Sequence, residues 1–168
     1  VTCGAGGSGE DGTYPLASAI HERFGVPVAA HLTCAYSSRA EIDDLVARYW
    51  ERGIRRIVAL RGDAPKGSER YEPRPDGYAY ASDLVRGLKR VADFEISVGC
   101  YPEVHPEAAS AEADLDNLKR KVDAGATRLI TQYCFDTDTI LRFRDAVVAA
   151  GIEAYEAAGG HRTRLAAP

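Results

Sequence analysis

Polar side chains follow or interrupt the apolar runs of this sequence, and these residues have the types that can do chemistry. Arg61 and Asp63 follow one run, His31 lies inside a second, and Gln132 lies inside a third. They offer charges of both signs together with hydrogen-bond donors and acceptors, which suits a large polar ligand. A structural explanation is also open, because buried histidines and glutamines often bond to protein, and Arg61 and Asp63 can pair with each other.

A glycine-rich segment, GAGGS at residues 4–8, has the composition of a phosphate-binding loop. Backbone N–H groups in such a loop can surround a phosphate, although the same composition is also that of a flexible turn. No lysine follows as in a P-loop, and the glycine spacing does not match a dinucleotide-binding motif. Both explanations therefore stay open.

The cysteines fall near the ends of apolar runs. With two nearby histidines they have the residue types of a zinc site, namely Cys3, Cys34, Cys100, Cys134, His31 and His105. However, no CxxC pair occurs, and scattered cysteines more often behave as small buried hydrophobes. We expect no metal, no disulfide framework and a reducing, cytoplasmic location. A zinc-dependent barrel hydrolase is the weaker alternative function.

The elements that must position these residues alternate between strand and helix. Short β-branched apolar runs predict buried parallel strands at residues 26–33, 56–61, 94–101 and 128–135, and residues 1–3 resemble the end of an earlier strand. Apolar residues recur at helical spacing over residues 15–24, 82–91, 112–124 and 137–150. The apolar faces predicted for the last three helices consist of Leu84, Val85 and Leu88, of Leu115, Leu118 and Val122, and of Ile140, Leu141 and Val147. A further helix is predicted between Ser38 and Gly53, because Ser38 and Glu41 have the spacing of a capping box. Its apolar residues follow at helical spacing and are Ile42, Leu45, Val46 and Tyr49.

This order predicts a parallel sheet, whose strands end at one edge, where such folds place their sites. The architecture is either a doubly wound open sheet or part of a (β/α)8 barrel. A full barrel usually needs about 250 residues, so the pattern alone slightly favours the open sheet. Residues 67–77 form a polar, proline-rich loop of a kind that is often functional, and residues 153–168 carry no β-branched run and are assigned no structure.

The chain has 168 residues and a net charge of −4, with 45% hydrophobic and 27% charged residues, which is a globular composition. Its mild acidity argues against a nucleic-acid partner. No apolar run approaches the roughly 18 residues that a membrane span needs. Methionine is absent even at position 1, so we expect the chain to be a fragment or a processed piece.

Taken together, the strand-end segments resemble the methylenetetrahydrofolate reductase family. The matching segments follow the family's order over residues 1–152 and are VTCGAGGS, AHLTCAYSSRAEI, GIRRIVALRGDAPKG, YASDLV, YPEVHPEA, EADLDNLKRKVDAGATRLITQYCFD and DTILRF. The resemblance implies a (β/α)8 barrel, incomplete here with about five βα units, in place of the open sheet. It also implies FAD as the cofactor and a ping-pong reduction of 5,10-methylenetetrahydrofolate to 5-methyltetrahydrofolate by NADH or NADPH, in one-carbon metabolism.

The resemblance further implies roles for individual residues. Residues that match those lining the flavin are Thr2, Ala5, His31, Arg61, Gly62 and Asp63. Residues that match those holding the ribityl, diphosphate or adenosine parts of FAD are Ala81, Tyr101, His105, Asp114, Asn117, Arg120 and Lys121. Asp63, the expected catalytic residue, and Gln132 match residues that face the folate, and Thr2 and Gln132 match residues near the nicotinamide.

The chemistry of these residues agrees with such roles. Asn117, Arg120 and Lys121 recur three and four residues apart on one predicted helix, so they can converge on a diphosphate. Without the resemblance, a solvated helix face would be the better explanation. An ionised Asp63 only accepts hydrogen bonds, which suits the N–H edge of a pterin, and its charge lowers the reduction potential of a nearby flavin. Gln132 both donates and accepts.

Some family features are missing from this sequence. Family members begin upstream with a strand that carries a glutamate, the proposed general acid, and that strand has no counterpart here. Residues 153–168 depart from the family, and Cys3 stands where an aromatic residue is usual. The alternative function is therefore a non-catalytic, truncated remnant that binds a ligand or partner without turnover. A homo-oligomer would cover the sheet edges that an incomplete barrel exposes.

Overall fold

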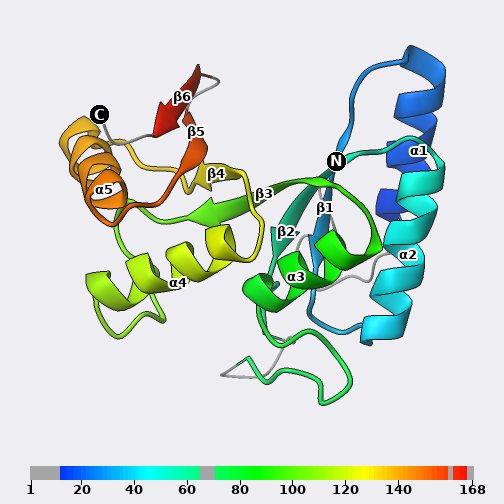
Figure 1. Cartoon of the computed structure of the whole chain (residues 1–168), viewed down its shortest axis with the longest axis horizontal. Coiled ribbons are helices and arrows are strands. Elements are labelled where there is room, and N and C mark those ends of the chain that lie inside the picture. Colours follow the sequence, from blue (N-terminus) through cyan, green and yellow to red (C-terminus); the bar gives the residue numbers. More distant parts are fainter. Residues whose placement is uncertain (1–11, 65–70, 159–160, 166–168) are drawn as a thin grey trace. The chain divides into compact units, whose positions relative to one another are not determined.

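The computed structural model describes residues 12–64, 71–158 and 161–165, with side chains up to residue 154 (Figure 1). The chain divides into two compact units, residues 1–96 and 97–168. In the described part of the chain, no helix is both long and apolar enough to cross a bilayer.

The first unit alternates helices and strands. Its elements are α1 (Thr13–Phe24), β1 (Ala29–Thr33), α2 (Arg39–Glu51), β2 (Arg56–Leu60) and α3 (Ala81–Val91). Strands β1 and β2 are parallel, with Ala29 opposite Arg56 and Thr33 opposite Leu60. Helix α1 packs against β1, α3 packs against β2, and α2 packs against α3 (Figure 1). The predicted parallel pairing is confirmed for these strands.

Local signals set the helix boundaries in this unit. The Oγ atom of Ser38 accepts a hydrogen bond from the N–H of Glu41 at 3.2 Å, and the N–H of Ser38 donates to Glu41 Oε2 at 2.7 Å. The predicted capping box at the start of α2 is thereby confirmed. Helix α1 ends before Gly25, as the sequence predicts.

The core of the first unit lies under α2 and α3. Helix α2 buries the four apolar residues that the helical spacing predicts, Ile42, Leu45, Val46 and Tyr49. Helix α3 buries Leu84, Val85 and Leu88, also as predicted. Ile57, Val58 and Ala59 of β2 are buried as well. Continuous burial along a strand is typical of a parallel sheet covered by helices.

The second unit continues the alternation from β3 (Glu95–Cys100), the strand in which the two units meet along the chain. The remaining elements are α4 (Ala111–Asp123), β4 (Arg128–Thr131), α5 (Thr137–Ala149), β5 (Ala154–Ala158) and β6 (His161–Leu165). Strand β4 pairs in parallel with both β3 and β5, and Cys100 lies opposite Thr131. Strand β4 is four residues shorter than the predicted strand, which ran to residue 135.

Strands β5 and β6 lie within residues 153–168, where the sequence predicts no element. The prediction missed them because the segment lacks the β-branched run that usually signals a strand. Backbone pairing supplies the strands instead: Arg128 lies opposite Tyr155, and the antiparallel β5–β6 pair sets Ala158 opposite His161. Neighbouring backbone groups can therefore impose a strand where side-chain propensity does not.

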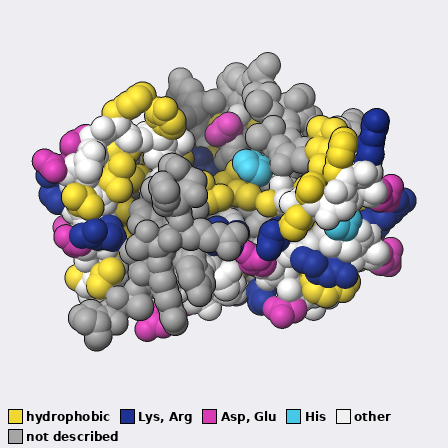
Figure 2. All heavy atoms as spheres, turned by 90° about the horizontal axis from the view of Figure 1, so that it is seen from above, with side chains coloured by type: hydrophobic (Ala, Val, Ile, Leu, Met, Phe, Trp, Pro, Cys, Tyr) yellow, Lys and Arg dark blue, Asp and Glu magenta, His cyan; other side chains and the backbone are white. Residues whose placement is uncertain are grey.

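The helices of the second unit bury far less of their apolar surface. Every residue of α4 and α5 is described, and each helix buries a single residue, Leu118 in α4 and Val147 in α5. Leu141 was predicted to face the core, yet it is 41% exposed. Apolar side chains, yellow in Figure 2, also reach the surface elsewhere in both units.

Candidate functional site

The carboxyl ends of β1 and β2 lie side by side because their pairing continues past the last strand residues. The N–H of Cys34 donates to the carbonyl of Leu60 at 3.1 Å, and the N–H of Ala35 donates to the carbonyl of Arg61 at 3.0 Å. At Gly62 the backbone has a φ of 90°, and a Cβ there would lie 2.8 Å from the Cβ of Ala35. Only glycine fits this turn.

Asp63 follows this turn and is exposed. Its backbone carbonyl accepts a hydrogen bond from the Tyr36 hydroxyl at 2.8 Å. Among the described residues, no hydrogen bond or ion pair to the Asp63 carboxylate is present. The backbone of this predicted catalytic residue is therefore anchored while its acceptor atoms face solvent, which is the arrangement that binding an N–H edge requires.

His31 lies inside β1 opposite Val58, two positions before the end of the strand. It is half-buried, and burial lowers the pKa of its imidazole from the ordinary value of 6.5. The ring is therefore neutral at neutral pH, and so it presents one donor and one acceptor nitrogen. His31 shares the strand pair with Arg61 and Asp63, but it lies deeper in the sheet than either.

A contact that the sequence did not predict joins Tyr71 to this strand end. The Arg61 Cζ atom lies 4.7 Å from the centroid of the Tyr71 ring. The Tyr71 hydroxyl donates to the carbonyl of Ala79 at 3.0 Å and lies 3.9 Å from the Cys34 Sγ atom. The only sequence signal was the long polar loop, which marked the region but no residue in it. We call residues 71–80 the strap.

Burial dominates the chemistry of the Cys34 thiol. It raises the pKa of Cys34 to about 11, so the thiol is protonated and unreactive at neutral pH. The Cys34 Sγ atom donates to the carbonyl of Arg61 at 3.3 Å. Cys34 therefore acts as a small buried residue, in agreement with the structural interpretation of the cysteines.

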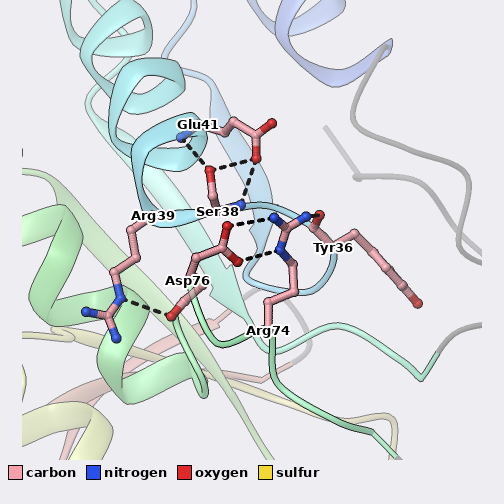
Figure 3. Close-up of polar contacts among 7 residues, drawn as sticks. Tyr36, Ser38, Arg39, Glu41, Arg74 and Asp76 are labelled. Carbon is pink, nitrogen blue, oxygen red and sulfur yellow. Dashed lines mark hydrogen bonds and ion pairs between the residues drawn. The ribbon is translucent and has the colours of Figure 1, made fainter.

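The strap is fixed to the loop between β1 and α2, as Figure 3 shows. Arg74 forms two hydrogen bonds to the Asp76 carboxylate, both at 2.8 Å, and its Nη1 atom donates to the carbonyl of Tyr36 at 3.0 Å. Arg39 Nε donates to the carbonyl of Gly77 at 2.9 Å. The Arg74–Tyr36 bond ties the strap to the same loop whose Tyr36 anchors the backbone of Asp63, and the Arg39–Gly77 bond ties it to the first residue of α2.

A buried tyrosine anchors the far end of the strap to α2 and α3. The Tyr78 hydroxyl donates to Asp43 Oδ1 at 2.7 Å and accepts from Arg90 Nη2 at 3.1 Å. A Cβ at Gly87 would come within 2.3 Å of the Tyr78 ring, so the ring occupies the space beside this glycine. Ala81, a predicted cofactor residue, is the buried first residue of α3, directly after the strap.

In the second unit, the residue after β4 lies beside the end of β3. The N–H of Gln132 donates to the carbonyl of Cys100 at 2.8 Å. The side chain of Gln132 is exposed, and its Oε1 atom accepts from the N–H of Tyr133 at 3.1 Å. The expectation that Gln132 lies in a buried strand is wrong, because β4 ends at Thr131. Its amide is available to a ligand.

The loop after β3 brings together three predicted cofactor residues. The rings of Tyr101 and His105 meet edge to face with centroids 4.6 Å apart. Asp114 Oδ2 accepts from the N–H of His105 at 2.9 Å, and His105 Nδ1 accepts from the N–H of Glu107 at 3.0 Å. A neutral His105 therefore carries its proton on Nε2. Within this loop, Val104 has a φ of 71°, a strained conformation for a β-branched residue.

Helix α4 carries the three residues predicted to converge on an anion. Lys121 Nζ donates to the carbonyl of Gly99 in β3 at 2.9 Å. Arg120 is exposed, and its Nη2 atom lies 3.5 Å from Asn117 Oδ1. The half-buried lysine thus reaches the strand, while arginine and asparagine lie together on the helix surface.

Part of the predicted site falls outside the described residues. Thr2, Ala5, Cys3 and the glycine-rich segment at residues 4–8 belong to this part. Within residues 12–64, 71–158 and 161–165, no three His, Cys, Asp or Glu side chains are grouped as metal ligands.

The two strand ends differ in the chemistry that they offer. In the first unit, an exposed carboxylate, a stacked guanidinium and a neutral imidazole can bind a ring with several hydrogen-bonding edges. In the second unit, Arg120 and Lys121 provide positive charge, and Asn117 and Gln132 provide amides, which suits an anionic or amide-bearing ligand.

Comparison with known proteins gives consistent matches. A family model described as methylenetetrahydrofolate reductase matches residues 1–158. The 5,10-methylenetetrahydrofolate reductases of Salmonella typhimurium (strain LT2) and Escherichia coli (strain K12) are 56% and 55% identical over 153 residues, which is 91% of this chain. A rice protein (Oryza sativa subsp. japonica) named as a probable methylenetetrahydrofolate reductase (NADH) is 41% identical over 154 residues, covering 85% of this chain and 26% of its own. The chain spans about half the length of the two bacterial relatives, 50% in each case.

Solved structures share the fold. A 2,3-dimethylmalate lyase of the PEP mutase/isocitrate lyase superfamily has a TM-score of 0.59 at 12% identity, covering 84% of this chain and 48% of its own. A phosphonopyruvate hydrolase has a TM-score of 0.57 at 14% identity, covering 79% and 46%. At such identities only the fold is comparable. It confirms an α/β chain that forms part of a (β/α)8 barrel, and the open sheet that the pattern alone slightly favoured is wrong.

Proposed function

The chain belongs to the methylenetetrahydrofolate reductase family, and from this premise we propose that it is the flavin-binding part of such a reductase. The proposed reaction is the reduction of 5,10-methylenetetrahydrofolate to 5-methyltetrahydrofolate by NADH or NADPH, with FAD as the cofactor, in the cytoplasm. The observation that carries the proposal is that polar residues follow β2 in the first unit and, separately, β3 and β4 in the second unit, in segments that the family model spans.

The residues present fit a flavin dinucleotide by the chemistry of their donors. A diphosphate needs cationic and amide donors, and Asn117, Arg120 and Lys121 supply them from α4. Lys121 Nζ already bonds to the carbonyl of Gly99 at 2.9 Å, which holds the ammonium near the end of β3. His105 and Tyr101, in edge-to-face contact, offer an imidazole donor and a planar ring for the sugar or base.

Asp63 has the central role in the first unit. Bound FAD would supply hydride transfer in two half-reactions, first from NAD(P)H and then to the folate. The succession of these half-reactions is the basis of the expected ping-pong kinetics. The exposed Asp63 carboxylate accepts hydrogen bonds from the pterin, and its negative charge lowers the reduction potential of the flavin. Gln132, with its exposed amide, orients the folate or the nicotinamide, and Arg61 and His31 line the flavin.

The first test is whether the purified chain retains FAD after the excess is removed, followed by absorbance. We expect a retained flavin band. Replacing Lys121 with Met keeps a flexible, unbranched side chain but removes its charge, and should weaken FAD binding about tenfold. Lys119→Met on the same helix is the matched control, because Lys119 pairs with Asp123 at the surface and should change affinity less than twofold. A colourless chain, or equal losses in both variants, would contradict the proposal.

The alternative is a remnant that binds flavin or a partner without turnover. The antiparallel pairing of β6 with β5 favours it, because strands of a (β/α)8 barrel are all parallel. A chain that holds FAD is assayed for NAD(P)H-dependent reduction of 5,10-methylenetetrahydrofolate, with Asp63→Asn for comparison. Turnover that Asp63→Asn abolishes supports the reductase, whereas bound FAD with no turnover supports the remnant.

A further inference from the structure

The strap places an aromatic ring beside Arg61, a residue that the proposed function assigns to the flavin. The Arg61 Cζ atom lies 4.7 Å from the centroid of the Tyr71 ring, within the range of a cation–π contact. Arg61 Nε also donates to the carbonyl of Gly62 at 3.1 Å. We propose that Tyr71 is a positioning residue that holds the Arg61 guanidinium ready for the flavin, an inference that rests on the proposed function.

The Tyr71 ring is held by contacts other than the one with Arg61. Its hydroxyl donates to the carbonyl of Ala79 at 3.0 Å and lies 3.9 Å from the buried Cys34 Sγ atom. The ring of Tyr80 lies 6.3 Å away on a tilted plane. Burial raises the pKa of Tyr71, so its hydroxyl stays protonated and remains a donor at neutral pH.

The strap itself is braced at Tyr78 and at the residues just before it. Arg74 joins Asp76 and the carbonyl of Tyr36, and Arg39 joins the carbonyl of Gly77 (Figure 3). The Tyr78 hydroxyl bonds to Asp43 of α2 at 2.7 Å. The position of the Tyr71 ring is therefore set by a frame that does not involve the Arg61 side chain. Because of this frame, the ring can orient the guanidinium and does not merely follow it.

Orientation matters because an arginine side chain has many rotamers. A guanidinium stacked on a fixed ring has already lost much of this freedom before a ligand arrives, so less is lost on binding. Tyr71 should therefore raise flavin affinity without touching the flavin.

The test measures FAD affinity of the full chain in five variants against the wild type. Tyr71→Leu removes the ring and should weaken FAD binding about fivefold to tenfold. Tyr71→Phe keeps the ring and loses only the hydroxyl bond to Ala79, so its affinity should stay within twofold of the wild type. Tyr14→Leu is the matched control, because Arg48 lies over the Tyr14 ring at 5.0 Å in a similar contact away from the strand ends. In an Arg61→Gln background, Tyr71→Leu should have no further effect, which a merely structural role would not produce.

A second measurement needs no flavin. The Arg61 Nε–H resonance in an NMR spectrum of the arginine-labelled chain should carry a ring-current shift that Tyr71→Leu removes and Tyr71→Phe keeps. Equal FAD affinity in Tyr71→Leu and wild type, or a further loss from Tyr71→Leu in the Arg61→Gln background, overturns the positioning role alone. A wild-type chain that binds no FAD overturns the proposed function and this role with it.

Discussion

The two compact units bury their helices to very different extents. Helix α2 buries four apolar residues and α3 buries Leu84, Val85 and Leu88, whereas α4 and α5 bury one residue each. Side chains near the carboxyl ends of the strands are likewise more covered in the first unit than in the second. In the first unit Tyr71 of the strap contacts the buried Cys34, while in the second unit Tyr133 and Phe135, close to Gln132 in the chain, are 77% and 89% exposed.

This difference indicates that the stability of the chain is concentrated in the first unit. Burial of apolar surface is the main favourable term in folding, and regions with few buried contacts open first. The second unit carries most of the cationic residues predicted to hold the flavin diphosphate. Ligand binding should therefore stabilise the second unit more than the first, because it adds contacts where the chain has fewest.

The strongest test of this comparison truncates one leucine in each unit. Leu84 in α3 is fully buried, so Leu84→Ala should lower the free energy of unfolding by about 2–5 kcal/mol. Leu141 in α5 is 41% exposed, so Leu141→Ala should lower it by less than about 1 kcal/mol. Urea denaturation followed by circular dichroism measures both. Similar losses would contradict the uneven distribution of stability.

The next test substitutes one left-handed glycine in each unit. Gly62 and Gly151 have φ values of 90° and 65°, so alanine is strained at both positions. At Gly151 this strain should lower the free energy of unfolding by about 1–2 kcal/mol. At Gly62 the added Cβ also meets the Cβ atoms of Ala35 and Thr33 at 2.8 and 3.1 Å. Gly62→Ala should therefore lower the free energy of unfolding by about 3 kcal/mol. Equal decreases in the thermal midpoint of the two variants would contradict the close packing of Gly62 against Ala35 and Thr33.

A smaller effect separates two residues that have positive φ without being glycine. Val104 has a φ of 71° and is β-branched, so Val104→Gly should raise stability by about 1 kcal/mol by relieving strain. Tyr36 has a φ of 73°, but its hydroxyl holds the carbonyl of Asp63, so Tyr36→Gly should lower stability. Denaturation of the two variants beside wild type checks the opposite signs.

The smallest expected effect is a pH dependence from His31. Burial lowers its pKa below 6.5, so between the folded pKa and 6.5 the unfolded chain binds more protons than the folded chain. Its contribution to stability is therefore complete above pH 6.5 and is lost as the pH falls through the folded value. We expect His31→Gln to reduce the fall in stability between about pH 7.5 and pH 5. If stability falls as much in His31→Gln as in the wild type, other titratable groups cause the fall.

Much of the fold follows from local signals in the sequence. Helical spacing predicted the buried face of α2, and the Ser38–Glu41 pair predicted its start. The same spacing overestimated burial in α4 and α5, because periodicity shows which face is apolar but not whether a neighbouring element covers it. Strands β5 and β6 went unpredicted because backbone pairing, and not side-chain propensity, forms them.

The site was predictable only in part. Residues that directly follow a strand, such as Arg61 and Asp63, are placed by the sequence once the strand is recognised. Tyr71 was not predicted, because its contact with Arg61 is a tertiary contact with a residue ten positions earlier in the chain. The exposure of Gln132 was missed because β4 ends one residue before it. Tertiary contacts and strand ends are the details that spacing alone does not contain.

The antiparallel β5–β6 hairpin has a consequence for complementation by a second polypeptide. Strand β5 pairs with β4 on one side and with β6 on the other, through five residue pairs from Ala154–Leu165 to Ala158–His161. A separate chain that supplied further parallel barrel strands would need the edge of β5, and β6 already occupies its hydrogen-bonding groups. The hairpin thus competes with strand addition at this edge, and its removal should be the first step in rebuilding a closed barrel from two pieces.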